Sequence, residues 1–256
     1  LHHDGERWRD LAPGGEETLW WVSGSGPDDV WMVGEQGRIL RWDGASFSSH
    51  ASGTDATLWG VYAFSKTDAW AVGGSPGKGA AAPNDIVLRW DGAAWAPDPL
   101  PGAPLGRALY KVWGTSSDDL YVVGEAGTIW HRGPAGWELQ SDPPIATGTL
   151  FTVHGCGASE IYAVGGQDVL RSDGQAWTKL DVALTNTVNG VACGAPGEAA
   201  KDISAKAIEL FNKRHTEEYG HGLVEPHHVL VIEPSDMRAH LRLGNGGDLV
   251  HHHVAD

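Results

Sequence analysis

The sequence predicts an all-β fold, a β-propeller of four-stranded blades, on the basis of two observations. A pattern that spans residues 19–47 recurs at 58–95, 109–137 and 150–177, and the equivalent valines Val22, Val61, Val112, Val153 and Val191 are 39, 51, 41 and 38 residues apart. The units are rich in Trp, Val, Gly and Asp-Gly, with 13 Trp and 36 Gly in the chain. A period near 40 residues with this composition is typical of propeller blades rather than of helical repeats. We expect about five or six blades.

Each unit is expected to supply four strands. In the first unit these are residues 19–23, residues 30–34 and the hairpin RILRW-DG-ASF. The second strand is apolar on both faces, as expected when sheets are stacked on each side of it. Asp-Gly is typical of a two-residue type I′ turn. This turn predicts four pairs of an apolar residue with an aromatic one: Leu40 with Phe47, Leu88 with Trp95, Trp130 with Trp137, and Leu170 with Trp177.

The repeats also predict the domain organisation. Residues 1–194 are assigned to the propeller: a partial blade at 1–17, repeats at 18–56, 57–107, 108–148 and 149–186, and the start of the last blade at 187–194. The first eight residues, LHHDGERW, have the hairpin pattern with Leu1 opposite Trp8. We therefore expect the C-terminal region to supply the inner strands of that blade, because a closed ring leaves no exposed edge.

Two interpretations of residues 195–256 remain open. The segment is either a divergent terminal blade with a short helical insertion or a small separate α+β unit. A helix is expected at 199–214, because its apolar residues share one face. Strands are expected at 229–232, 240–243 and 248–252.

Composition argues against some partners and compartments. The formal net charge of −15 disfavours nucleic acids and anionic membranes, both of which favour a basic surface. No apolar run reaches the roughly 18 residues of a membrane span, and no signal peptide is recognised. Two cysteines, Cys156 and Cys193, can form one bridge between neighbouring units or remain two buried thiols.

The units WVSGSGPDDVWMVGEQGRILRWDGASF and VHGCGASEIYAVGGQDVLRSDGQAW resemble Asp-box (BNR-like) propeller repeats of secreted or surface proteins from bacteria. SDGQAW at 172–177 is a shortened version of the family pattern SxDxGxxW, with one residue missing between Asp and Gly. ILRWDG and VLRWDG are also similar to the strand-turn signature of tectonin-type lectins. The resemblance covers about residues 1–194. It implies a propeller that is secreted, periplasmic or at the cell surface, and for the lectins it implies sugar binding.

Candidate ligand-binding residues lie on the face formed by the loops between second and third strands, where the copies of the repeat differ. Glu35 and Glu125 lie in these loops, and Arg107 lies in a connection between blades. Trp21 departs from its column, in which the other copies have Gly60, Lys111, Thr152 and Gly190. An insertion at 74–85 on the same face is either a lid or partner loop or a solvated insertion.

Repeated side chains favour structural roles. One aromatic column consists of Trp20, Trp59, Tyr110 and Phe151, and a second of Trp31, Trp70, Tyr121 and Tyr162. Aromatic rings can stack on sugars, but regular repetition inside strands favours packing between blades. A carboxylate precedes each second strand: Asp29, Asp68, Asp119 and Glu160. These side chains can bind Ca²⁺, although bonding to the local backbone is favoured.

The C-terminal segment is rich in histidine and carries a metal hypothesis. His215, His221 and His227 are the candidate ligands for Zn²⁺, because imidazole and carboxylate groups suit this ion. The spacing is not that of HExxH, and a solvated polar segment is the alternative. No cofactor is expected, and Ca²⁺ or Zn²⁺ is the alternative.

These observations favour a non-enzymatic propeller that binds a carbohydrate or a protein partner on its loop face. One alternative is a sialidase-like glycoside hydrolase acting through the loop carboxylates Glu35 and Glu125, since glycosidases use a carboxylate pair. The other is a metal-binding function in the histidine-rich tail.

Overall fold

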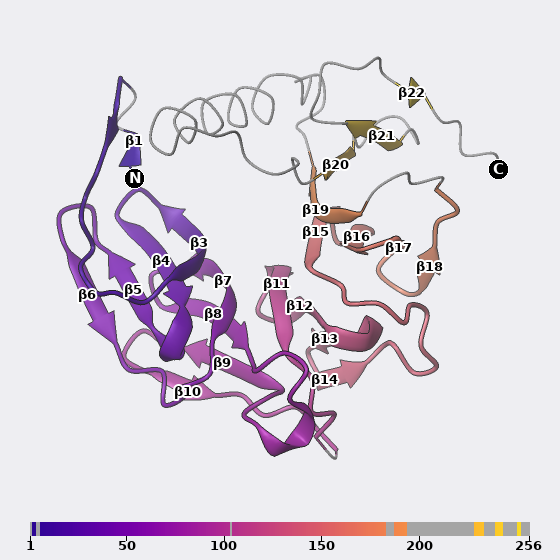
Figure 1. The fold of residues 1–256 in the computed structure, drawn as a ribbon, viewed down its shortest axis with the longest axis horizontal. Coiled ribbons are helices and arrows are strands. Elements are labelled where there is room, and N and C mark those ends of the chain that lie inside the picture. Colours follow the sequence, from indigo (N-terminus) through magenta and orange to yellow (C-terminus); the bar gives the residue numbers. More distant parts are fainter. Residues whose placement is uncertain are drawn as a thin grey trace.

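The computed structural model describes residues 2–3, 6–102, 104–182, 187–193, 228–232, 239–242 and 250–251. Four antiparallel four-stranded sheets succeed one another and surround a common centre, which makes the fold a β-propeller (Figure 1). The first strand of each sheet lies near the centre and the fourth at the rim. The first two blades are β3 (Leu19–Gly26), β4 (Asp29–Gly34), β5 (Ile39–Trp42) and β6 (Phe47–His50), then β7 (Leu58–Ser65), β8 (Asp68–Gly73), β9 (Ile86–Trp90) and β10 (Trp95–Pro97). The next two are β11 (Leu109–Ser116), β12 (Asp119–Gly124), β13 (Ile129–Gly133) and β14 (Gly136–Leu139), then β15 (Thr152–Gly157), β16 (Glu160–Gly165), β17 (Asp168–Ser172) and β18 (Trp177–Lys179).

Aromatic rings from neighbouring blades form the core. Trp31 on β4 is fully buried and lies 5.0 and 5.1 Å, between ring centroids, from Trp90 and Trp95 of the next blade. Trp70 and Tyr121 make the equivalent contact with an aromatic ring of the following blade's fourth strand, each at 5.9 Å. The expected packing role of the second aromatic column is therefore confirmed for these three positions.

The hairpins pair in a different register from the one that the Asp-Gly turn predicts. Trp42 pairs with Phe47, and the corresponding pairs are Trp90 with Trp95, Arg132 with Trp137, and Ser172 with Trp177. Only Gly44 of the first turn has positive φ, at 95°, so the turn is not type I′. The predicted pairs were wrong by two residues. A shift of two leaves every side chain on its predicted face, and Leu88 still packs in one buried cluster with Trp95.

The carboxylate of the turn aspartate explains the longer loop. Asp43 Oδ1 accepts hydrogen bonds from the backbone amides of Ala45 and Ser46, at 2.9 and 2.7 Å. The amide of Asp43 in turn donates to the carbonyl of Ser46 at 3.2 Å, which closes a four-residue loop. Asp91 and Asp173 accept the same pair of amides in the second and fourth blades. Aspartate therefore acts here as a side-chain cap of the turn.

The chain ends form two further sheets. β1 (His2–His3) and β2 (Trp8–Arg9) form a two-stranded hairpin in which His3, and not Leu1, pairs with Trp8. β19 (Val188–Cys193) heads a four-stranded sheet with β20 (His228–Ile232), β21 (Ala239–Arg242) and β22 (Val250–His251). β19 and β20 are parallel, unlike the first two strands of the other blades. Among the described strands, β20–β22 pair within this sheet and not with β1–β2, which differs from the expected completion of the first hairpin.

Three further sequence-based expectations concern cysteines, membrane spans and the tail helix. Cys156 of β15 is disulfide-bonded, which decides in favour of a bridge. Within the described part of the chain, no helix is long and apolar enough to cross a membrane. The helix expected at 199–214 lies outside the described residues.

We expect acid to destabilise the protein through the turn aspartates. Two backbone hydrogen bonds hold the pKa of each of Asp43, Asp91 and Asp173 below the usual aspartate value. A carboxyl group whose pKa is lower in the folded state stabilises the fold above its unfolded pKa, and this contribution is lost as the pH falls through the folded pKa. The triple Asp→Asn variant keeps an accepting oxygen and removes the titration. Its free energy of unfolding, measured in urea from about pH 5 downward, should therefore depend less steeply on pH than that of the wild type.

The matched control is Asp55→Asn/Asp181→Asn, at exposed aspartates outside these turns. An equal flattening of the pH dependence in this control would contradict the role of the turn carboxylates.

Candidate functional site

The loops between second and third strands lie on one face together with the connections that enter the first strands. The amide of Glu35 donates to the carbonyl of Thr18 at 2.9 Å, and that of Glu125 donates to Ala108 at 3.0 Å. In the fourth blade the direction is reversed: the amide of Val188, at the start of the following sheet, donates to the loop carbonyl of Gly166 at 2.8 Å. We call the surface formed by residues 35–37, 74–85, 125–127 and 166–167 the loop face.

The carboxylates of Glu35 and Glu125 brace these loops. Each begins a short 3₁₀ turn, η1 (Glu35–Gly37) and η3 (Glu125–Gly127). Glu35 Oε2 accepts a hydrogen bond from the amide of Thr18 at 3.1 Å, and Glu125 Oε2 accepts one from Ala108 at 2.8 Å. The second oxygen of Glu125 accepts the amide of Gly77 at 2.8 Å. The two glutamates belong to separate, non-adjacent blades, and their bonds are to backbone amides.

Arg107 and the insertion meet on the loop face. Arg107 Nη1 donates to Thr128 Oγ1 at 2.8 Å, and its carbonyl accepts the amide of Asp85 at 2.9 Å. Asn84 holds the insertion together: its Nδ2 donates to the carbonyls of Ser75, Gly79 and Gly106 at 3.3, 2.9 and 3.3 Å. The insertion is thus bonded internally and tied to the third blade through Glu125, which makes it an ordered part of the loop face.

The first aromatic column forms a continuous row around the centre. We call Trp20, Trp59, Tyr110 and Phe151 the aromatic arc. Successive ring centroids are 5.1, 5.5 and 5.2 Å apart, and each contact joins two neighbouring blades. Trp20 and Phe151, the two ends of the arc, are 46% and 37% exposed. The rings therefore pack between blades, as the sequence favoured, and also present apolar surface to solvent.

A β-bulge sets the direction of three of these rings. Leu19 pairs with Gly34 and Trp21 with Val33, so Trp20 is the extra residue of the strand. Trp59 and Tyr110 occupy the same extra position in β7 and β11. A bulge re-aims a side chain away from strict alternation and occurs often beside functional sites. Because the sequence pattern does not show the bulge, this signal was missed at the level of the sequence.

Trp21 contacts Lys111, which occupies the equivalent position in the third blade and was not predicted to be a site residue. Lys111 Nζ lies 2.7 Å from the centroid of the Trp21 ring. Trp21 is 41% exposed, whereas Lys111 is only 7% exposed. Desolvation by burial lowers the pKa of Lys111 to about 7. The candidate site therefore combines the aromatic arc with the Trp21–Lys111 pair, and Glu35, Glu125 and Arg107 support the loops above it.

The carboxylates that precede the second strands bond to protein groups. Asp29 is fully buried and accepts hydrogen bonds from Ser25 and Arg41, at 2.5 and 2.9 Å. Asp119 accepts one from Thr115 at 2.5 Å and pairs with His131 at 3.0 Å. These bonds give the carboxylates a structural role within the blades.

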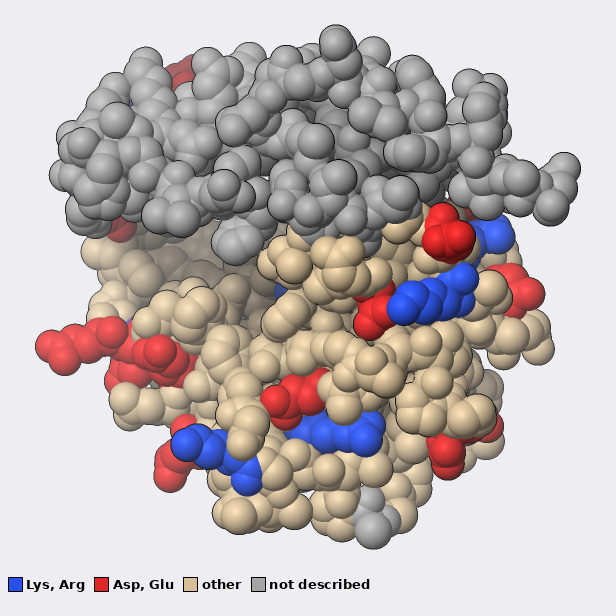
Figure 2. Space-filling model, turned by 45° about the vertical axis from the view of Figure 1, so that its right-hand side comes forward, with Lys and Arg blue, Asp and Glu red and all other residues tan. Residues whose placement is uncertain are grey.

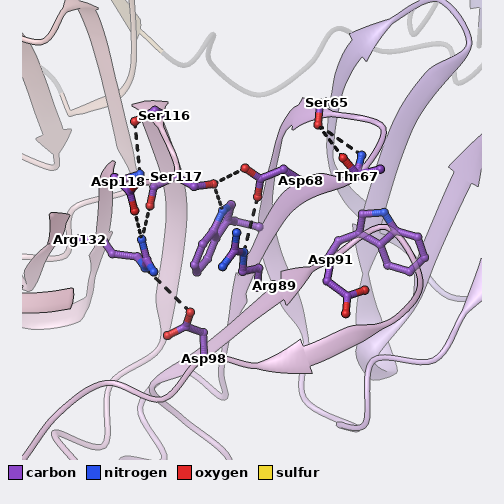
Figure 3. A network of polar contacts seen from close by, with 12 residues as sticks. Ser65, Thr67, Asp68, Arg89, Asp91, Asp98, Ser116, Ser117, Asp118 and Arg132 are labelled. Atoms are coloured by element: carbon purple, nitrogen blue, oxygen red, sulfur yellow. Dashed lines mark hydrogen bonds and ion pairs between the residues drawn. The ribbon is translucent and has the colours of Figure 1, made fainter. Parts of the chain in front are cut away.

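The second of these carboxylates belongs to a network between the second and third blades (Figure 3). Asp68 accepts a hydrogen bond from the hydroxyl of Ser117 of the next blade. Its Oδ1 lies 3.6 Å from Nε of Arg89. The guanidinium carbons of Arg89 and Arg132 lie 5.3 and 5.2 Å from the ring centroid of buried Trp70. Arg132 also pairs with Asp118 at 2.8 Å (Figure 3). The network therefore stabilises contact between two blades.

A polar cleft of about 620 Å³ lies beside the first blade. Its lining includes Ser49, Ser52, Thr54, Asp55 and Arg38. Arg38 is engaged with Glu17, at 3.2 Å between Nη1 and Oε2. No Trp, Tyr or Phe lines the cleft.

The search for metal ligands gives no second site in the described part. No group of three or more His, Cys, Asp or Glu able to hold a metal ion occurs among the described residues. The candidate zinc ligands His215, His221 and His227 lie outside them. On the face shown in Figure 2, basic and acidic side chains lie in small separate groups over a mainly uncharged surface.

Solved structures support the propeller fold. The WD40 β-propeller domain of Doa1 superposes with a TM-score of 0.56 at 10% identity, covering 93% of this chain and 68% of that chain. The extracellular domain of BT4673 from B. thetaiotaomicron superposes at 0.51 and 10% identity, over 88% of this chain and 26% of that one. The chain is a β-propeller.

YCF48 from Cyanidioschyzon merolae reaches a TM-score of 0.48 at 18% identity, covering 68% of this chain and 59% of that one. A YCF48 structure bound to D1 peptide gives 0.49 at 17%, covering 68% of this chain, which spans 56% of that structure. No protein-family model and no curated protein matches the chain.

We expect Asn84→Ala to loosen the insertion. The substitution removes the Nδ2 group, whose two N–H donors are shared among three backbone carbonyls, and the Oδ1 atom that accepts the amide of Ser75 at 2.7 Å. Each hydrogen bond lost contributes about 0.5–1.5 kcal/mol. Trypsin should then cleave after Lys78, which is exposed within the insertion, several-fold faster than in the wild type. Cleavage after Lys66, in the turn between β7 and β8, is the internal control. Equal acceleration at both lysines would indicate general unfolding and contradict a local role of Asn84.

Proposed function

We propose that this propeller is a non-enzymatic binding module that recognises a protein partner through the aromatic arc and the neighbouring residues Trp21 and Val22. The observation that carries the proposal is the exposed apolar row. Trp20, Trp21, Val22 and Phe151 are the large hydrophobic side chains that stand out as exposed among the described residues, and Val22 is 57% exposed. The equivalent valines Val61, Val112 and Val153 are each buried against the preceding blade, so the exposure of Val22 marks the side of the first blade that no described blade covers.

This row has the chemistry of a protein-binding surface. Adjacent exposed apolar side chains mark interaction sites more often than scattered ones do. Trp and Tyr are enriched among the residues that contribute most to protein–protein binding, because they bury a large area with few rotatable bonds. Contact between the rings, at 5.1–5.5 Å, limits their rotation before binding. Such preorganisation lowers the entropic cost of association.

A carbohydrate partner is the second candidate, and the polar cleft beside the first blade is the observation that favours it. A sugar site combines an aromatic platform with polar groups that bond to hydroxyls. The cleft has polar groups and no aromatic platform. Beside the arc, the carboxylates of Glu35 and Glu125 are bonded to backbone amides. The aromatic rings and the polar groups that a sugar site needs therefore lie in different places, which favours the protein partner over the glycan.

The same bonds give no support to a glycosidase. A glycoside hydrolase needs two carboxyl groups that flank one bond at roughly 5–10 Å. Glu35 and Glu125 brace loops of separate blades. We therefore assign them a supporting role for the binding surface.

We expect the exposed ends of the arc to dominate partner binding. A peptide display library and a glycan array are screened against the same wild-type protein, and selected peptides are then measured by calorimetry. Trp20→Ala/Phe151→Ala should weaken peptide binding at least about 30-fold, corresponding to a loss of about 2 kcal/mol or more. Phe47→Ala, on the outer strand of the first blade, is the matched control and should bind as the wild type does.

Two results would overturn the proposal. One is peptide binding that is the same in the double variant and the wild type. The other is selective binding of glycans without any selected peptide, which would transfer the assignment to the polar cleft.

We further propose that the protein functions in an oxidising compartment, outside the cytoplasm. The disulfide of Cys156 supports this, because disulfides persist mainly in secreted, periplasmic and surface proteins. Alkylation of protein from native extract, before and after reduction, should show blocked cysteines that become reactive only after reduction. Free thiols at both cysteines in the native protein would contradict the proposal.

A further inference from the structure

Lys111 is unusual among the charged residues that the structure describes. It lies on β11, the innermost strand of the third blade, and is 93% buried. Its ammonium group makes no hydrogen bond or ion pair with any described residue, and its one specific contact is the ring of Trp21. A buried charge without a counterion is costly, so proteins usually pair such groups or neutralise them. Lys111 is therefore placed where an anion would be stabilised.

The first strands of three successive blades create this position. Trp21, Gly60 and Lys111 occupy equivalent positions in β3, β7 and β11, each paired with a valine of the adjoining second strand. A methyl group added at Gly60 would lie 2.7 Å from the carbonyl oxygen of Tyr110 and 3.2 Å from the Cα of Lys111. Glycine in the middle blade therefore lets the backbone of β11 lie close to β7, and Lys111 of the third blade meets Trp21 of the first.

The neighbouring residues determine which anion fits. Tyr110, adjacent to Lys111 in the strand, belongs to the aromatic arc. Trp21, which holds the ammonium, is 41% exposed, so the pair adjoins the surface that is open to solvent. An anion that reaches Lys111 therefore passes aromatic side chains. This favours an organic anion with an apolar body, and a single ammonium without further donors suits one carboxylate.

We propose that Lys111 is the carboxylate-binding residue of the candidate site and pairs with an acidic group of the ligand seated on the aromatic arc. This inference rests on the proposed function, because the carboxylate would belong to the protein partner, either as an acidic side chain or as the terminal carboxylate of the polypeptide. Trp21 positions the ammonium through its ring face, because the face of an indole ring attracts a cation. The ligand carboxylate replaces the hydration that burial removes.

Burial is consistent with this role. It lowers the pKa of Lys111 to about 7, with desolvation as the only cause. A bound carboxylate favours the charged amine and must raise that pKa, by linkage. Binding of a carboxylate should therefore weaken as the pH rises through the lysine pKa of the complex.

The experiment follows Lys111 itself and uses small probes. Protein labelled with ¹³C at lysine Cε is titrated by NMR, with the Lys111 signal assigned by its loss in Lys111→Met. The probes are N-acetylphenylalanine, which carries a C-terminal type of carboxylate, N-acetylglutamic acid α-amide, which carries a side-chain carboxylate, and N-acetylphenylalaninamide, which has none. At least one carboxylate should raise the Lys111 midpoint by about one pH unit, equivalent to tenfold preference for the charged amine, and the amide should not.

The two carboxylates distinguish the sources of the acidic group. A shift with N-acetylphenylalanine alone indicates the terminal carboxylate of a polypeptide, and a shift with the glutamate derivative alone indicates an acidic side chain. No shift of the Lys111 midpoint with either carboxylate at millimolar concentration would overturn the proposal. An equal shift with the amide would also overturn it.

A variant keeps this test separate from that of the proposed function. Lys111→Met retains the length of the side chain and should bind the carboxylate that shifts the Lys111 midpoint no more tightly than it binds the amide. Lys179→Met, at an exposed lysine, should still bind that carboxylate more tightly than the amide, as the wild type does. Thermal unfolding checks that both variants are folded. If carboxylates bind at Lys111 but Trp20→Ala/Phe151→Ala leaves peptide binding unchanged, the proposed function fails and the site remains. If the arc variants lose peptide binding but carboxylates leave Lys111 unchanged, only the present inference fails.

Discussion

The structure depends on contact between aromatic rings of successive blades. Each blade has two faces to bury, and a single four-stranded sheet cannot cover both. Trp31 solves this for the first blade, because its ring enters the next blade between Trp90 and Trp95. Replacement of such a buried ring by alanine typically costs about 3–5 kcal/mol. The contact recurs from blade to blade, so the stability of each blade depends on its neighbour and the order of the repeats in the sequence becomes their order around the ring.

Polar groups around these rings add direction to the packing. Trp70 bonds through its indole N–H to Ser117 of the next blade at 2.9 Å. Trp137 and Trp177 bond to Asp98 and Gln140 of the preceding blade, at 3.0 and 2.8 Å. Rings alone can slide against one another, whereas these hydrogen bonds fix the rotation of one blade on the next. The inner strands are therefore held in constant register, which allows residues of different blades to meet at the centre.

The sequence contained most of the architecture and part of the site. Period, strand order and the packing role of Trp31, Trp70 and Tyr121 follow from residue patterns, because repetition displays which positions are buried. The hairpin registers do not follow from the sequence. The carboxylate of Asp43 accepts hydrogen bonds from two backbone amides and so stabilises a four-residue loop, whereas the propensity of Asp-Gly predicts a two-residue turn. The bulges at Trp20, Trp59 and Tyr110 are invisible for a similar reason, since one unpaired residue changes no composition. Lys111 was visible only as a member of the column that Trp21 breaks.

The side chains near the centre of the propeller differ from one blade to the next, although the strands that carry them repeat. A strictly repeated column would place the same side chain in every blade and fill the axis with identical groups. Here tryptophan, glycine and lysine occupy the equivalent positions of three blades. The glycine lets the backbone of the third blade approach the second, and the lysine contacts the tryptophan of the first. An apolar residue of similar volume would make the fold more stable than a buried lysine does. The cost of desolvating the lysine is not offset by an ion pair among the described residues. The cost of keeping the ammonium is therefore understandable if a ligand supplies the missing charge, and the exposed rings beside it are the surface by which that ligand would be held.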